Sequence, residues 1–312
     1  MYPEKQVSGE KQTGKTFRWI HTFTQNKEEM KEVSKKHKIP DYVIESAGDP
    51  NEVPRREHWD INRSQIPDLL ILKYPYKIQG DLGYEEYVTL PLTIITLEET
   101  VLTFSQTEVL FLTDFPEKNI FSSEIWDRDY FILSLIWKIG AEYIDCLTEI
   151  NKRMDKLENK MTVSTQSDLL FGLMALQKSL VYFDSAIDSN HPLIKELQSL
   201  EFFTEAERSR SLLHQALIEI EQAEKMVAET HQLLTQIGDV FSSAIGNNLN
   251  TVVKFLSSIT IILSIPSIIG ALWGMNVPVP LTHHPAGFFI LGVLSILLTV
   301  VSIWYFYKKK YL

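Results

Sequence analysis

The clearest pattern along the chain is a pair of apolar segments near its C-terminal end. Leu256–Leu272 with its flanks, and Gly287–Tyr307, each approach the roughly 20 apolar residues that a helix needs to cross a bilayer. The connector "VPVPLTHHP" contains three prolines, which end any continuous helix. We therefore predict two transmembrane helices, and the alternative is a hairpin buried in a soluble core. The predicted parts are a first helix over about 251–273, an outer loop over 274–286, a second helix over about 287–307 and a basic tail over 308–312.

Two segments in the middle of the chain repeat apolar residues at alternating spacings of four and three. The first extends from Tyr143 to Met161, and the second from Leu169 to Ile187. This spacing gathers apolar side chains on one face of a helix, and it is typical of helices that pack as an antiparallel pair.

A third segment keeps this spacing from Leu213 to Phe241, and no proline lies between Pro192 and Pro266. We expect one helix from about residue 204 into the first membrane segment, about 100 Å long at 1.5 Å per residue. Such a rod would link cytoplasmic events to the membrane mechanically. It would also serve as an ordinary coiled-coil stalk, and the two interpretations are compatible.

Residues 17–135 show shorter patterns, typical of a mixed α/β region. The stretches "DLLILKYPY" and "YVTLPLTIITLEETVLTFS" are rich in residues that favour strands, whereas "NKEEMKEVSKKH" predicts a short surface helix and "AGDPNEVPRREHWD" predicts turns. The fold class that we predict is an α+β cytoplasmic domain with a long helical stalk and two C-terminal transmembrane helices. The domain boundaries are 1–135, 136–250 and 251–312.

Charge is distributed unevenly along the chain. No Asp, Glu, Lys or Arg occurs from Phe255 to Tyr307, whereas residues 1–253 carry all 40 acidic and 26 of the 30 basic residues, a net charge of −14. This balance disfavours nucleic acid as a partner and suits a body that meets cations. Lys254 and Lys308–Lys310 flank the membrane segments, so the positive-inside rule predicts a multi-pass cell-membrane protein with both termini in the cytoplasm. The one cysteine, Cys146, excludes an internal disulfide and a Cys-rich zinc site.

Small and polar residues form a stripe along the first membrane segment, at spacings of 7, 3, 4, 3, 4 and 3, which place them on one face of a helix. One interpretation is close helix packing with hydroxyls that bond across the interface or back to their own helix. The other is a water-filled pore, which several copies in a closed ring would have to surround, since two helices cannot enclose one. The stripe consists of Asn250, Ser257, Thr260, Ser264, Ser267, Ala271 and Gly274.

Gly274-Met275-Asn276 ends the first membrane segment, and "YKKKYL" closes the second. In this position the tripeptide resembles the motif of the CorA family of divalent-cation channels, known for magnesium and cobalt transport. The family usually has Tyr before this motif, where this chain has Trp273, and "NNLNTVVKFL" is similar to the inner mouth of the family's pore. The likeness is close over about residues 235–312 and is one of layout over about 17–235.

The resemblance implies a funnel-like homopentamer in which the first membrane helices line the pore, with Mg²⁺ as the main ion, Co²⁺ and Ni²⁺ as further ions, and no resident cofactor. Gly274, Met275 and Asn276 would form the selectivity filter, where Asn276 holds the cation through its hydrating waters. Asn250 would form a polar ring at the inner mouth, and Asp239 would be an acidic position just below the pore. Val253 and Leu256 match apolar constrictions, whereas Ser264 is polar where the family has another constriction.

The chemistry of Mg²⁺ fits such a filter independently. The ion dehydrates reluctantly, so neutral amide oxygens that bind its waters would permit both entry and release. The competing interpretation of Asn276 is a helix C-cap, because Asn tolerates the left-handed conformation. Gly274 would let carbonyls approach and permit a turn after the helix. The loop lacks the acid that many family members carry and offers only His283 and His284, which would gain charge in acid and oppose cations.

In the family, cytoplasmic Mg²⁺ between subunits holds the channel shut. The competing interpretation of the acids is a solvated surface, and Gln215 stands where the family's best-known pattern has an Asp. The candidate ligands are Glu219, Glu221 and Glu224 on the long helix and Asp81, Glu85 and Glu86 in the α/β domain.

Three other functions remain open at this point. The first is a zinc transporter similar to the ZntB group and coupled to protons, and the second is a membrane-anchored scaffold or sensor without transport. An enzyme is the third, but no nucleophile elbow, HExxH motif or complete phosphate loop occurs, because "SGEKQTGKT" lacks the full glycine spacing.

Overall fold

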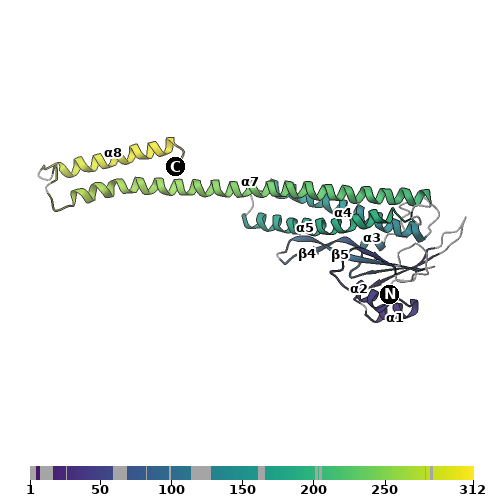
Figure 1. Cartoon of the computed structure of the whole chain (residues 1–312). Helices are drawn as coiled ribbons and strands as arrows, with labels where there is room; N and C mark the ends of the chain where they lie inside the picture. The colour runs from purple at the N-terminus through teal and green to yellow at the C-terminus, as the bar shows by residue number, and fades with distance from the viewer. Residues whose placement is uncertain are drawn as a thin grey trace. The chain divides into compact units, whose positions relative to one another are not determined.

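The structure is a computed structural model of the chain, in which two compact units, residues 1–236 and 237–312, are described separately. One helix, α7 (Glu207–Trp273), has residues in both units (Figure 1). The described residues are 5–7, 17–25, 27–58, 69–81, 83–97, 100–113, 128–160, 166–200, 203, 206–277, 279–281 and 284–312. The sequence "SGEKQTGKT" and His283 lie outside them.

The N-terminal unit is built on a six-stranded sheet with the order β1-β2-β6-β5-β4-β3. Neighbouring strands are antiparallel except β2 and β6, which are parallel. The longest pairing joins β4 to β5, from Leu69 opposite Ile95 to Gln79 opposite Glu85. The strands are β1 (Lys5–Val7), β2 (Phe17–Phe23), β3 (Arg55–Glu57), β4 (Leu69–Gln79), β5 (Glu85–Thr96) and β6 (Thr100–Ser105).

Helices cover both faces of this sheet (Figure 1). The short helices α1 (Lys27–His37) and α2 (Asp41–Ala47) bury Met30 and Val43 against Leu102 and Phe104 of β6 and residues of β4 and β5. On the opposite face, α4 (Arg128–Lys160) and α5 (Gln166–Leu197) pack on β4 and β5, after the single-turn helix α3 (Leu110–Thr113).

The first part of α7 packs against α4 and α5. A Cβ atom on Gly140 of α4 would lie 2.8 Å from Cβ of Glu219, so only glycine permits this approach. Further along, the Thr230 hydroxyl donates a hydrogen bond to the Asn151 side chain at 3.0 Å. These contacts fix α7 to the N-terminal unit.

The two predicted helices of the middle region and the third, longer helix are confirmed. All six seam residues from Leu169 to Ile187 are buried in α5, and Tyr143, Leu147, Ile150 and Met154 are buried in α4. α4 nevertheless begins at Arg128, before the predicted domain boundary at residue 136. The sequence pattern missed this start because the first turns of α4 are buried on all sides and show no helical period. β3 forms within the segment predicted as turns, since a short edge strand tolerates polar residues.

A buried amide joins α5 to the sheet. The Asn190 side chain accepts a hydrogen bond from the Lys73 N–H at 3.0 Å and donates one to the Lys73 carbonyl at 2.7 Å. The hydroxyl of Tyr143 donates to the same carbonyl at 3.0 Å. Lys73 lies just beyond the end of the pairing between β3 and β4, which reaches only Ile71, so the two side chains satisfy backbone groups that β3 does not reach.

Candidate ion pathway in the C-terminal unit

The C-terminal unit is a helical hairpin made of the end of α7 and α8 (Gly287–Lys308). Both helices are long and apolar enough to cross a membrane, and both are almost entirely unburied over their most apolar windows. The hairpin is joined at its open end by the ammonium of Lys254, which lies 5.5 Å from the centre of the Tyr311 ring. The sequence pattern did not predict this contact between the C-terminal end and α7.

One face of each helix forms the contact between them. On α7 this face includes Ser258, which is 2% exposed, with Ile262, Ile265 and Ile269 half-buried beside it. On α8 the half-buried positions are Leu291, Ser295, Thr299, Ser302 and Phe306. The scattered hydroxyls of α8 therefore lie on its side toward α7 and away from the lipid-facing surface.

The polar stripe lies on the other side of α7. At about 100° per residue, the stripe is centred about 150° from the row that contacts α8. Asn250, Ser257, Thr260 and Ser267 are exposed in the single chain, and Ser264 is half-buried. The apolar positions Val253 and Leu256, expected to be constrictions, are also exposed, and so is Asp239. The hairpin thus leaves the stripe uncovered except at Ser264.

Three of the four stripe hydroxyls bond to their own helix. Thr260 donates to the carbonyl of Leu256 at 2.9 Å, Ser264 to Ile261 at 2.8 Å and Ser267 to Leu263 at 3.2 Å. Pro266 lies within the same stretch without ending the helix. These bonds satisfy the hydroxyl protons without a second helix, so the stripe does not need a packing partner for them.

The Gly274-Met275-Asn276 segment follows the last residue of α7 directly, and all three residues are exposed. None of them has a positive φ angle, so Asn276 is not a left-handed cap. Gly274 does not provide a left-handed turn either, because its N–H still bonds the Gly270 carbonyl at 3.0 Å and continues the helical pattern. The identity of Asn276 is therefore not explained by the backbone.

The sharp turn of the connector lies at Leu281 instead, where φ is 71°. Its carbonyl accepts a hydrogen bond from the N–H of His284 at 3.2 Å. The Nδ1 atom of His284 in turn accepts one from the Ala286 N–H at 3.2 Å. Trp273 crosses the loop, and its indole N–H donates to the carbonyl of Pro280 at 2.9 Å. Sequence reasoning found neither Leu281 nor this bond.

The proposed regulatory acids do not converge within one subunit. Glu85 pairs with Lys77 at 2.7 Å and with Arg153 at 2.5 Å, and the hydrogen bond from Lys77 is the main cause that lowers the pKa of Glu85. Glu86 is buried, and Lys178 lies 3.4 Å from it.

The acids on α7 have other surroundings. Glu224 lies 2.9 Å and Glu221 3.8 Å from ring nitrogens of His191 on α5. Glu219 is half-buried against Gly140, whereas Asp81 is exposed near the end of β4. Among the described residues, no group of three or more His, Cys, Asp or Glu side chains is placed to hold a metal ion.

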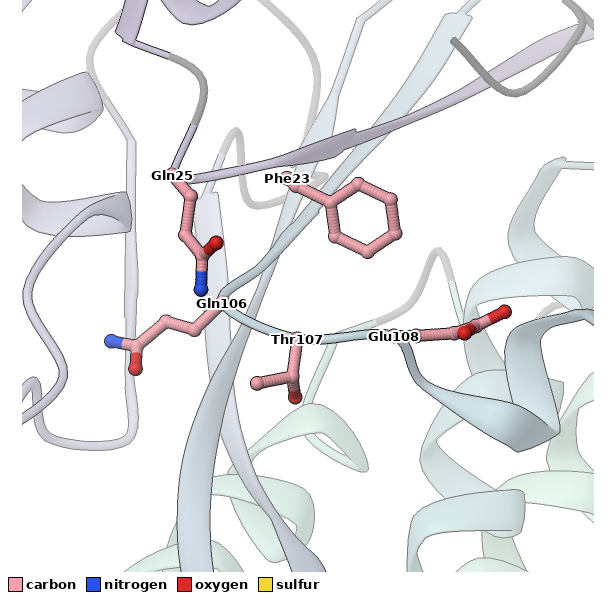
Figure 2. A pocket seen from close by; sticks show the side chains of 5 residues that line it. All are labelled: Phe23, Gln25, Gln106, Thr107 and Glu108. Carbon is pink, nitrogen blue, oxygen red and sulfur yellow. The ribbon is translucent and has the colours of Figure 1, made fainter.

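The N-terminal unit also has a depression of about 650 Å³ where the parallel strands β2 and β6 end. Figure 2 shows its lining, in which the carboxylate of Glu108 points away from Gln25 and Gln106. Beside it, His21 bonds Thr103 at 2.9 Å, and burial lowers the pKa of His21 to about 4, so this ring is neutral at physiological pH. Glu108 is the one charged residue among the described residues that line the depression.

Comparisons with known proteins agree with the layout. The model of the family described as "CorA-like Mg²⁺ transporter protein" matches residues 14–309. The cobalt/magnesium transport protein CorA of Methanocaldococcus jannaschii is 23% identical over 303 residues, covering 94% of this chain and 91% of the relative.

Solved structures show the same fold. The complete structure of the CorA magnesium transporter from M. jannaschii superposes with a TM-score of 0.74 at 21% identity, covering 95% of this chain and 92% of that one. The cytoplasmic domain of ZntB from Vibrio parahaemolyticus gives a TM-score of 0.57 at 12% identity, covering 76% and 93%. The family match and the two apolar helices place the protein in a membrane. Because the family model spans nearly the whole sequence, the chain belongs to the CorA-like Mg²⁺ transporter family.

Proposed function

We propose that the protein is a divalent-cation channel that carries Mg²⁺, with Co²⁺ and Ni²⁺ as further ions. The observation that carries the proposal is the polar stripe of α7, which faces away from α8 and leads to Gly274-Met275-Asn276. Lipid offers no hydrogen-bond partner to the amide of Asn250 or to the lone pairs of the stripe hydroxyls, so an aqueous axis between several α7 helices suits this face better. The relatives named for magnesium and cobalt transport support the choice of ions.

The assembly that we propose is a homopentamer with α7 at the centre and α8 on the outside. The single chain supports this arrangement because α8 covers the face of α7 opposite the stripe. In the assembled pore, Asn250 and Asp239 mark the inner mouth, Val253 and Leu256 form constrictions, and the hydroxyls of Ser257, Thr260, Ser264 and Ser267 line the middle.

At the outer end, the amide oxygens of Asn276 hold the hydrated cation through its first water shell. Neutral acceptors suit an ion that gives up water reluctantly, because they bind it without competing for its inner coordination sites. Gly274 and Met275 shape the same ring. The exposure of Asn276 and its ordinary backbone conformation support this role, since no structural task in the single chain accounts for the side chain.

Both termini lie in the cytoplasm in this proposal, as the basic residues at the ends of the hairpin favour. An inside-negative potential then drives uptake with about 2.3 kcal/mol per charge per 100 mV, or about twice that for a divalent ion. Cytoplasmic Mg²⁺ bound between subunits closes the channel. Its candidate ligands are Asp81, Glu85, Glu86, Glu219, Glu221 and Glu224, which would have to combine across a subunit boundary.

The decisive experiment is ion flux into vesicles that contain the purified full-length protein, with Mg²⁺, Co²⁺, Ni²⁺ and Zn²⁺ compared with and without a pH gradient. Asn276→Ala should alter divalent flux by at least tenfold, whereas Asn248→Ala should leave it unchanged. Asn248 is a matched control because it is an exposed asparagine of α7 and, at about 100° per residue, lies about 140° from the centre of the stripe.

Each alternative predicts a different result in this assay. Zinc uptake that depends on the pH gradient would favour a proton-coupled zinc transporter. Vesicles that stay closed to every ion with the wild-type protein would favour a membrane-anchored scaffold and would end the channel proposal.

A further inference from the structure

We propose that Trp273 is a positioning residue for the Gly-Met-Asn filter, through a hydrogen bond that closes the connector over it. The inference deepens the proposed function and rests on it. Trp273 is the last residue of α7, and its Nε1–H donates to the carbonyl of Pro280 at 2.9 Å. The bond closes a ring around residues 274–279, which include all three filter residues.

The chemistry of the indole makes this contact specific. A tryptophan N–H is a donor only, and a half-buried indole keeps a partner for it. Pro280 has no N–H, so its carbonyl is the one backbone group that it can offer. The pair therefore joins the end of the helix to the far side of the loop in one defined register.

A second, independent constraint lies at the next residue. Leu281 adopts φ 71°, a conformation that a residue with a Cβ atom avoids unless its surroundings impose it. A Cβ atom on Gly287 would lie 2.5 Å from the Leu281 carbonyl oxygen, so the first turn of α8 presses closely on this strained residue. The N–H of His284 also bonds the same carbonyl at 3.2 Å.

The connector is thus held at both ends. Trp273 ties it to α7, and the approach of Gly287 to Leu281 ties it to α8. The filter residues between these points make no left-handed turn of their own, so the anchors decide where the Asn276 amide lies. Loss of the indole bond would free the loop without removing any group that touches the cation.

Trp273→Phe tests this role because it keeps an aromatic ring and removes the N–H. The matched control is Trp304→Phe, the same change at an exposed position of α8 whose ring contacts Lys308. Hydrogen exchange of the full-length protein should show faster exchange in the peptide that covers residues 274–281 by about two- to tenfold, the equilibrium effect of one hydrogen bond. Trp304→Phe should leave this peptide unchanged.

Ion flux separates a positioning role from a purely structural one, because a purely structural role would not change the apparent KM or the ion preference. In vesicles, Trp273→Phe should raise the apparent KM for Mg²⁺ by about two- to tenfold and change the ratio of Mg²⁺ to Co²⁺ transport, while the maximal rate changes less. If Trp273→Phe does not assemble, Gly287→Ala disturbs the other anchor and should shift exchange and KM in the same direction.

The two proposals fail in different ways. Vesicles in which wild-type protein carries no divalent ion would refute the channel, whereas the exchange comparison would still test the loop. A transporting wild type whose Trp273→Phe variant matches Trp304→Phe in exchange, KM and ion ratio would refute the positioning role.

Discussion

Asn190 offers the sharpest test of what holds the N-terminal unit together. Its side chain is fully buried, and it pairs with both backbone groups of Lys73 on β4. Asn190→Leu keeps a side chain of similar volume but removes both partners. The Lys73 carbonyl keeps its hydrogen bond from Tyr143, whereas the Lys73 N–H loses its acceptor.

The expected magnitude follows from this asymmetry. A buried donor left without a partner costs about 1–3 kcal/mol, and the second lost bond adds about 1 kcal/mol because the carbonyl remains satisfied. We therefore expect Asn190→Leu to lower the free energy of unfolding by about 2–4 kcal/mol. For a unit of this size, each kcal/mol lowers Tm by about 2–4 °C.

Thermal unfolding of the full-length protein in detergent, followed by circular dichroism, measures the effect. Ser189→Ala is the matched control, since Ser189 is the exposed neighbour that bonds only within α5, and it should change Tm by less than about 2 °C. Tyr143→Phe should cost about 1 kcal/mol, and the double variant with Asn190→Leu should cost more than the sum, because both donors to the Lys73 carbonyl are then lost. Equal Tm values for Asn190→Leu and Ser189→Ala would refute the reasoning.

Three further changes test other parts of the molecule. Ser257→Leu should block divalent flux but leave the hairpin folded. Ser258→Leu, at the buried contact between α7 and α8, should instead destabilise the hairpin. If the two variants had equal effects on flux and on thermal stability, the assignment of the two faces of α7 would be contradicted. Gly140→Ala should lower stability by about 1–3 kcal/mol because its Cβ meets Glu219, and an unchanged melting curve would be inconsistent with that contact. Burial, with nearby carboxylates, raises the pKa of Cys146 to about 12, so its thiolate becomes abundant only near that pH. Iodoacetamide at pH 8 should therefore label Cys146 slowly until the protein unfolds. Fast labelling of the folded protein would contradict this raised pKa.

The sequence predicted those elements that have one buried face. The apolar faces of α4, α5 and α7 could be predicted because apolar residues at helical spacing contact a single partner surface. The start of α4 could not be predicted, because Phe131–Ile136 is buried on every side and its apolar residues show no helical period. β3 was missed because the ladder of a short edge strand is made by backbone groups and not by apolar side chains.

The candidate site shows the same division. The stripe follows from spacing along one helix and the tripeptide from its resemblance to the family motif, so both candidates came from the sequence. The bond from Trp273 to Pro280 and the turn at Leu281 depend on how the connector closes in space, which no periodicity records. The sequence also did not show that the polar positions of α8 lie toward α7, because spacing alone does not say which side of a helix meets its partner.

The hydroxyls of Thr260, Ser264 and Ser267 each donate their only proton to a carbonyl of α7 itself. Lone pairs are all that these oxygens can still turn outward. Water in the shell of a cation directs its hydrogens away from the ion, and water around an anion directs its oxygens away. In the pore that we propose, these hydroxyls would therefore favour a hydrated metal cation over hydrated chloride through the orientation of water alone, without any charged side chain.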